Sequence, residues 1–226
     1  MLLDLNYHPR QGRVEQSDAY QTFSPSPPLS HWVQTFWQLN VPDGHFCYRS
    51  MPDNSVDWII NLNDPEDNFI ITPFSSSIVF ELTGPVSFFG IRFRILGHQG
   101  LIAMPLGEWG SVEEDAGAAE VLPDPVQYAV YEALNISINK SIRFNERCQY
   151  LSAILLRSAK PHSIDSRLAR YIRYCHHNIA SNISLSDKQC SEFGLSARQL
   201  RRLTDTITLR THAEGIFEGI SVSAYA

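Results

Sequence analysis

The sequence predicts an α+β protein in which an antiparallel β-barrel or sandwich comes first and helices follow. Between residues 31 and 93, short apolar or aromatic runs alternate with turn residues, which is typical of antiparallel strands. After Gly97 the apolar residues are spaced by three and four, as in amphipathic helices. Near Gly194 two short helical patterns meet at a turn. We therefore place a β-rich domain at 1–124, a helical linker at 125–162 and a single, partial helix-turn-helix domain at 163–226.

Six runs make up the predicted strands: His31 to Leu39, Phe46 to Met51, Val56 to Leu62, Asn68 to Thr72, Ser77 to Leu82 and Val86 to Phe93. Proline, glycine, asparagine and aspartate favour the fixed or left-handed φ of turns. They predict turns at Pro42-Asp43-Gly44, Pro52-Asp53-Asn54, Asn63-Asp64-Pro65 and Thr83-Gly84-Pro85. Strands in unbroken succession favour a sandwich or barrel. The polar first thirty residues end in a proline-rich stretch, which predicts an arm or an edge.

Two amphipathic helices are predicted next, at Tyr128 to Leu134 and Ile142 to Leu156. The second has an apolar stripe suited to packing on the β domain or on a second subunit. Its members are Phe144, Cys148, Leu151 and Leu155, and Arg143, Arg147 and Gln149 are expected outside it. After a break at Pro161, Ser163 or Asp165 can cap a further helix that runs to about Asn178. That helix has Leu168, Ile172 and Cys175 on one side.

Composition excludes several classes of protein. The chain is 43% hydrophobic and 19% charged, and it has no apolar run of the roughly 20 residues that a membrane helix needs. Its start lacks the layout of a secretory signal, so we expect a cytoplasmic protein with no membrane partner. The four cysteines form no C-x-x-C pair, and reduced, buried thiols are expected.

The charge is divided unequally along the chain. The net charge of -6 argues against DNA binding at first sight, but residues 1–164 contain ten Lys and Arg against eighteen Asp and Glu. Residues 165–211 contain eight basic against four acidic residues, a balance of +4. Phosphate contacts depend on the local field of the docking face, so the basic segment is the candidate DNA-binding part.

Residues 183–203 contain the pattern of a helix-turn-helix, with its turn at Gly194-Leu195-Ser196. Gly194 can adopt the positive φ of a tight turn, and the Ser196 hydroxyl can accept a bond from an amide of the following helix. That helix is basic and has side chains able to bond base edges or phosphates in a major groove. The candidate DNA-binding residues are Ser196, Arg198, Gln199, Arg201 and Arg202, and the leucines at 195, 200 and 203 would attach the helix to the protein.

The segment Gly194-Leu195-Ser196-Ala197-Arg198-Gln199-Leu200-Arg201-Arg202-Leu203 resembles the first helix-turn-helix of the AraC family of bacterial transcription regulators. Three further stretches are similar to a cupin-like sensor domain in one branch of that family: Trp37, Met51 to Asn61 and Phe89 to Phe93. Leu106 to Leu122 is loosely similar to its helical continuation. The resemblance implies a small-molecule-responsive transcription regulator that binds DNA as a homodimer.

The chain departs from the family pattern at its C-terminal end. Two helix-turn-helix units occupy roughly one hundred residues in the family, and this chain has room for one. Thr204, Leu209 and His212 stand where an aromatic residue, a glycine and a proline are usual, and Gln189 replaces a core leucine. We therefore expect a C-terminally truncated regulator. The alternative is a sensor or dimerisation module without independent DNA binding that modulates a full-length regulator.

An enzyme is not expected. A cupin metal site uses an H-x-H pair, but His45 is followed by Cys47, and His98 has no acidic partner at strand spacing, which favours a surface or turn histidine. His176 and His177 are adjacent and diverge by about 100° on a helix. No nucleophile elbow or phosphate loop is present. We expect no catalytic residue, metal or cofactor. Asp53 and Asp57 are interpreted as turn caps, and Glu113-Glu114-Asp115 as a helix start.

A small-molecule pocket in the β domain is the remaining hypothesis. Its candidate residues are Trp37, Tyr48, Trp58 and Arg92, with Phe89 and Phe93 as further aromatic surface. Arg92 and Arg94 alternate with Ile91 and Phe93, so the arginines must point to the opposite side of the sheet. An aromatic pocket that contains one charge would suit an unidentified effector. The alternative is that the aromatic residues fill the core and the arginines are solvated.

Overall fold

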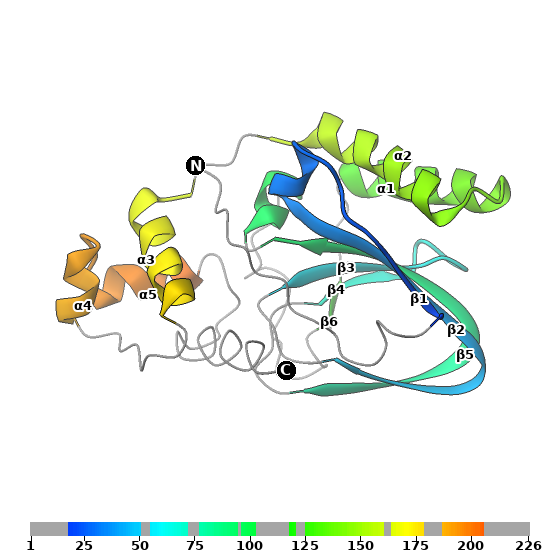
Figure 1. The fold of residues 1–226 in the computed structure, drawn as a ribbon, viewed down its shortest axis with the longest axis horizontal. Helices are drawn as coiled ribbons and strands as arrows, with labels where there is room; N and C mark the ends of the chain where they lie inside the picture. Colours follow the sequence, from blue (N-terminus) through cyan, green and yellow to red (C-terminus); the bar gives the residue numbers. More distant parts are fainter. Residues whose placement is uncertain are drawn as a thin grey trace.

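The computed structural model describes residues 18–50, 55–71, 77–94, 96–102, 118–120, 125–160, 164–178 and 187–205. It confirms an α+β chain in which an antiparallel sheet precedes the helices (Figure 1). The strands are β1 Tyr20–Phe23, β2 Val33–Ser50, β3 Val56–Asn61, β4 Asn68–Ile71, β5 Ile78–Phe93 and β6 Ala118–Glu120. Their order is β1-β2-β5-β3-β4-β6, with every neighbouring pair antiparallel. Within the described strands the sheet is open, with β1 and β6 at its edges.

The two longest strands pair along almost their whole length and contain residues that the sequence assigned to turns. β2 runs through 42–44 and β5 runs through 83–85, so the turns predicted at these positions are wrong. The two segments lie opposite each other, with Gly44 paired to Gly84 and a register shift between Val41 and Gly44. Gly44 has a φ of 97°. The glycines therefore accommodate a bulge, which bends a ladder without ending it. Figure 1 shows the β2–β5 ribbon curling back beneath the rest of the sheet.

The edge predicted for the N-terminal part is present. β1 pairs with β2 through Tyr20–Leu39 and Phe23–Phe36, and it has no second neighbour in the described sheet. A short 3-10 helix, η2, follows at Leu29–His31, and another, η3, lies at Gly97–Gly100 after β5. The predicted turn at 52–54, the acidic run at 113–115 and the segment 206–226 lie outside the described residues.

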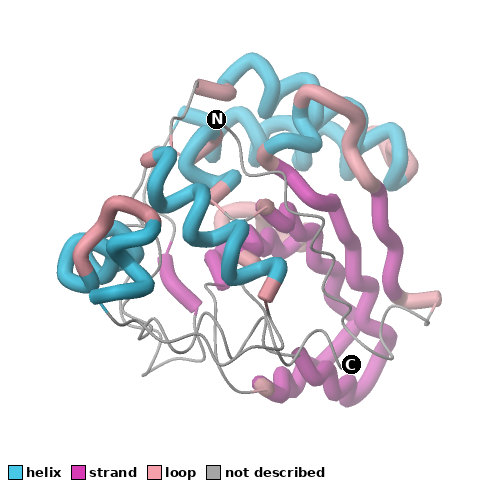
Figure 2. Tube along the Cα trace, turned by 60° about the vertical axis from the view of Figure 1, so that its left-hand side comes forward, coloured by secondary structure: helices cyan, strands magenta, loops and turns pink. Residues whose placement is uncertain are grey.

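Helices α1 (Pro125–Asn139) and α2 (Phe144–Ser158) form a hairpin on one face of the sheet, which we call the helix face. Both helices were predicted, with shorter or shifted bounds. Phe36, Trp58 and Phe89 of the sheet are buried together with Leu134 and Leu151 of the helices, in one apolar core. Figure 2 shows the same layer from another side, with both helices over one side of the strands. The α2 stripe therefore packs on the sheet, one of the two predicted alternatives.

Arg147 of α2 is buried, so the prediction that it lies outside the apolar stripe on the exposed side is wrong. It is 8% exposed. Its Nε donates to the Ser137 hydroxyl at 2.8 Å, one Nη donates to the Gln38 side-chain oxygen at 2.6 Å, and the other to the Ile142 carbonyl at 3.3 Å. Burial lowers the pKa of this guanidinium below its usual value. Arg147 thus joins both helices and their connection to β2.

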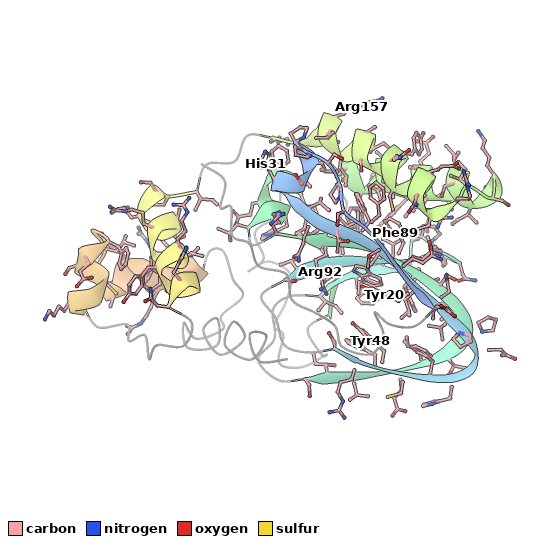
Figure 3. The ribbon with its side chains drawn as sticks, in the orientation of Figure 1. Tyr20, His31, Tyr48, Phe89, Arg92 and Arg157 are labelled. Atoms are coloured by element: carbon pink, nitrogen blue, oxygen red, sulfur yellow. The ribbon has the colours of Figure 1, made fainter. Side chains whose placement is uncertain are left out.

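The opposite face of the sheet, which we call the inner face, lies within the curl of β2 and β5. Its buried apolar residues form a cluster of their own: Trp37, Leu39, Val41, Ile59 and Ile71. Half-buried residues surround them: Ala19, Tyr20, Phe46, Phe69, Phe80, Leu82, Val86 and Phe88. In Figure 3, Tyr20 and Arg92 lie on this side, whereas Phe89 lies towards the helices. The two faces of the sheet therefore differ, because helices cover only one of them within the described chain.

Three further helices share a separate core: α3 Ser166–His177, α4 Asp187–Glu192 and α5 Ala197–Asp205. Leu168, Tyr171 and Cys175 of α3 pack there against Cys190 of α4 and Leu200 of α5. The helix predicted to end at about Asn178 is confirmed, with Leu168 and Cys175 buried on one side and Ile172 half-buried. No helix in the described part of the chain is long and apolar enough to span a membrane.

Candidate functional site

The turn between α4 and α5 is built by hydrogen bonds that end α4. The Leu195 amide donates to the Cys190 carbonyl at 3.2 Å, and the Gly194 amide donates to the Ser191 carbonyl at 2.9 Å. This is the Schellman arrangement, in which the residue after the helix takes a left-handed conformation. Gly194 has a φ of 72°, as the sequence predicted. Leu195 then enters the core and fixes where α5 begins.

Ser196 and Gln199 form a reciprocal cap on α5. The Gln199 amide donates to the Ser196 hydroxyl at 3.1 Å, and the Ser196 amide donates to the Gln199 side-chain oxygen at 2.9 Å. The capping role predicted for Ser196 is confirmed. Gln199 was predicted only as a DNA contact, although the pattern Ser-x-x-Gln at a helix start is the sequence signature of a capping box. Both side chains proposed as DNA contacts are thus occupied in holding the first turn.

The side of α5 that points away from the core is basic. Ala197 and Leu200 are buried and Leu203 is half-buried, which defines the inward side. Successive residues turn by about 100°, so Arg198 and Arg202 fall opposite these three and Arg201 falls at the flank. All three arginines are exposed. The predicted reading helix therefore has exposed arginines on its surface side, with Arg198 and Arg202 at the centre and Arg201 at the edge.

Helix α3 supports the turn from behind. The Arg170 guanidinium donates to the Phe193 carbonyl at 3.0 Å. The Phe193 ring lies between Tyr171 and Tyr174, with ring centroids 5.3 Å away in each case. Arg167 also donates to the Gly194 carbonyl at 3.4 Å. These contacts bring donors to carbonyls that follow the end of α4, where cations are favourable.

Two titratable groups of α3 have pKa values shifted from their usual range: Asp165 at its N-terminus and Cys175 in its core. Asp165 caps α3 by accepting from the Arg167 amide at 2.9 Å, and it pairs with the Arg167 guanidinium at 2.7 Å. These bonds lower the pKa of Asp165 to about 2. Burial raises the pKa of the Cys175 thiol to about 12, so this thiol is neutral at physiological pH. The expectation of buried thiols is met at Cys148, Cys175 and Cys190, whereas Cys47 is exposed.

A second cluster of polar groups lies on the inner face of the sheet. Arg92 of β5 pairs with Asp57 of β3, with Nη2 3.0 Å from one carboxylate oxygen and Nε 3.1 Å from both. The Trp37 indole donates to the same carboxylate at 2.8 Å. All three residues are buried. The interpretation of Asp57 as a turn cap is wrong, because it lies within a strand between two apolar neighbours, Val56 and Trp58, and faces the arginine of the adjacent strand.

Trp37 fits its place closely. A Cβ added to Gly90 would lie 1.9 Å from the indole ring, so the ring lies directly against the Gly90 backbone. Tyr20 of the edge strand also stacks on the Trp37 ring, with ring centroids 5.8 Å apart and planes 23° apart. The indole is thereby held between β1 and β5 while its N–H reaches Asp57. Any side chain at position 90 would displace it.

The four candidate ligand residues do not share one surface. Trp37 and Arg92 meet on the inner face, and Tyr48 lies farther along the curled ribbon, stacked on Phe80 with centroids 6.0 Å apart (Figure 3). Trp58 lies on the helix face, where it is 1% exposed, contacts the Tyr131 ring and donates to the Asn68 side chain at 3.0 Å. Strand alternation separates Trp58 from the others, so its inclusion in the same pocket is wrong. The predicted opposition of Arg92 to Ile91 and Phe93 is confirmed.

The histidines do not gather into a metal site within the described residues, where no group of three metal-ligating side chains occurs. His45 lies 3.3 Å from Glu81, and both side chains are exposed. His98 is 1% exposed and its ring contacts Phe93, so it is a buried histidine of η3 and not a surface one.

Comparisons with known proteins bear mainly on the sheet. A family model described as a domain of unknown function, DUF6597, matches residues 21–115, a span that includes β2 to β5. No functionally curated protein matches the chain. One solved structure, described as the AraC-like transcriptional activator CuxR, is similar over 94% of this chain and 92% of its own, with 13% identity and a TM-score of 0.29. A TM-score this low does not establish a shared fold.

Proposed function

We propose that the chain is a DNA-binding transcription regulator of AraC type that responds to a small molecule. The observation that carries the proposal is the exposed arginine face of α5, presented by a helix that a Schellman turn and a capping box hold in place. The resemblance of residues 194–203 to the first helix-turn-helix of AraC regulators supports it. α5 is the reading helix, and Arg198, Arg201 and Arg202 meet the DNA.

The electrostatics favour this assignment. Exposed arginines attract the phosphate backbone and can also bond base edges in a major groove. Two arginines of α3 have partners within the domain, since Arg167 pairs with Asp165 and Arg170 bonds a turn carbonyl. Ser196 and Gln199 act by capping α5, which presents the exposed arginines.

The inner face of the sheet is the proposed effector site. Its residues are apolar and aromatic, several are only half-buried, and within the described chain no helix covers them. Such surfaces with few polar groups suit small organic ligands. The Asp57–Arg92 pair is the polar group buried there, and Trp37 and Tyr20 supply flat contact area. Trp58 takes no part, because it belongs to the other face.

Dimerisation completes the proposal. A single short module buries little DNA surface, whereas two linked reading helices raise affinity by a factor on the order of one hundred or more when the geometry allows both to engage. A homodimer would bind two half-sites separated by a whole number of helical turns. The operator is thus expected to be a repeated element.

Fluorescence anisotropy with random-sequence duplex DNA at low and moderate salt tests the proposal. We expect binding by the full chain that weakens steeply as salt rises, and a strong loss in the double variant R198A/R202A. Arg157→Ala is the matched control, since Arg157 is an exposed arginine of α2, far from α5 in Figure 3. Absence of binding at low salt would reject DNA binding and favour the sensor or dimerisation module. Equal loss in both variants would reject the assignment of α5.

A further inference from the structure

The arginine face of α5 also indicates which bases it reads, an inference that rests on the proposed function. We propose that Arg198 and Arg202 each recognise a guanine, and that the two guanines lie about two base pairs apart in each half-site.

Arg198 and Arg202 extend from α5 in nearly the same direction. Arg198 and Arg202 are four residues apart, which places them about 40° from each other around the helix, both opposite the buried side. Arg201 is rotated away from this centre line. When the inward side rests on the protein, Arg198 and Arg202 point to the floor of the groove, whereas Arg201 points to its wall. Arg201 therefore contacts phosphate.

The separation of Arg198 and Arg202 along α5 matches two base-pair steps of a duplex. Four residues of α-helix advance about 6 Å along the axis. Base pairs of a duplex are about 3.4 Å apart, so two steps cover about 6.8 Å. A helix lying along the major groove thus places its two central arginines over base pairs two steps apart. Arg198, the second residue of α5, is also in the N-terminal part that contacts base edges in this type of motif.

The side chains of α5 favour guanine over adenine. Arginine bonds the O6 and N7 of guanine through two donors, while adenine is read by the paired donor and acceptor of a glutamine or asparagine. Gln199 is the glutamine of α5, and its side-chain oxygen already accepts from the Ser196 amide at 2.9 Å. Gln199 cannot also accept from adenine through the same pairing without opening the cap. With Gln199 engaged in the cap, the arginines determine the base preference of this helix, and that preference is guanine.

Selection of bound duplexes from a randomised library tests the inference with the full chain. We expect an enriched element with two guanines separated by one base pair, on one strand or on opposite strands. Arg198→Ala should remove the preference at one guanine and Arg202→Ala at the other, each by a factor on the order of ten to one hundred.

Lysine variants separate base reading from phosphate binding. Arg198→Lys and Arg202→Lys keep the charge but lose the paired donors, so we expect binding to random DNA to persist while the guanine preference falls. Arg201→Ala should lower affinity for all sequences alike and reduce the salt dependence by about one phosphate contact.

Two results would overturn the inference and leave DNA binding intact. One is an enriched element without the paired guanines, and the other is a uniform loss for all sequences in R198A and R202A, which would make both residues phosphate contacts. Failure of the wild-type chain to enrich any duplex would instead reject the proposed function itself. Melting curves followed by circular dichroism identify any variant that is merely unfolded.

Discussion

The same residue type has opposite surroundings in two regions of this protein. In the sheet domain, Arg92 and Arg147 are 7% and 8% exposed, and their donors bond a carboxylate, two side-chain oxygens and a carbonyl. In the C-terminal helices, Arg198 and Arg202 are exposed and lie on the side opposite the core. A buried guanidinium must be paired to offset its lost hydration, whereas an exposed one can exchange water for phosphate or base. The first pair therefore has a structural role, whereas the second pair is exposed on the side of α5 that we propose contacts DNA.

The largest expected effect is the loss of the carboxylate that pairs with Arg92. Asp57→Ala leaves a buried guanidinium and the Trp37 indole N–H without their acceptor. Breaking one side of a buried ion pair costs about 3–5 kcal/mol. We expect the free energy of unfolding, measured by urea denaturation, to fall by that amount.

Two variants sharpen this result. Glu81→Ala removes the exposed partner of His45 and should change the unfolding free energy by less than about 1 kcal/mol. The double variant D57L/R92M replaces the pair by apolar side chains and should recover much of the loss. A small effect of Asp57→Ala, similar to that of Glu81→Ala, would contradict the structural role of the pair.

Arg147→Met is expected to have an intermediate effect. Methionine keeps an apolar stem but removes the bonds to the buried Ser137 hydroxyl and the half-buried Gln38 oxygen, which then lack this donor. The expected loss is about 1–3 kcal/mol of unfolding free energy. The exposed Arg157→Ala of the same helix is its control, and we expect no measurable change there. Equal stability of the two variants would show that the three bonds of Arg147 are replaceable by water.

Ser196→Ala tests the cap of α5, the proposed reading helix. Loss of an N-cap hydroxyl costs about 1 kcal/mol, and it should loosen the first turn of α5. Hydrogen exchange of the amides at 198 and 199 should become faster, while exchange in β2 and β5 stays unchanged. Ser196→Asp keeps an acceptor at the cap and should restore protection. Unaltered exchange in the alanine variant would mean that the core contacts of Leu195 and Leu200 alone hold the helix.

The smallest effect concerns the pH dependence of α3. The pKa of Asp165 is lowered from 3.8 to about 2 in the folded chain, so its stabilising contribution is complete above about pH 4 and is lost as the pH falls towards 2. Asp165→Asn keeps a capping side chain without the charge. The melting temperature of the wild type should exceed that of the variant at pH 5, and the difference should disappear near pH 2. A difference that stays constant over this range would exclude the charge as its cause.

The local features of the C-terminal helices could be predicted from sequence because they depend on neighbours in the chain. Gly194 predicts the turn before α5 and Ser196 predicts its N-cap, and the leucines at 195 and 200 indicate the buried side of the helix. The partnership of Ser196 with Gln199 also has a local signature. Once Gln199 is known to close the capping box, the composition of the exposed face follows from helical periodicity alone.

The sheet was harder to predict because its contacts are distant in sequence. Asp57 and Arg92 meet only because β3 pairs with β5, and no local pattern shows that pairing. The segments around Gly44 and Gly84 are rich in the residues typical of turns, but they lie opposite each other in one antiparallel ladder with a bulge. Residue type alone suggests that Trp58 and Trp37 share a pocket, whereas their positions in two different strands place them on opposite faces of the sheet. Arg147 is different: its position three residues after Phe144 and four before Leu151 already placed it beside the apolar stripe.

DNA binding by α5 is tested most directly by hydrogen exchange of the full, unmodified chain, measured at each residue with and without duplex DNA. We predict protection on binding at residues 196–205, with the sheet segment 78–93 unchanged. Protection confined to the sheet, with α5 unaffected, would contradict DNA binding by α5 and place the binding surface on the sheet.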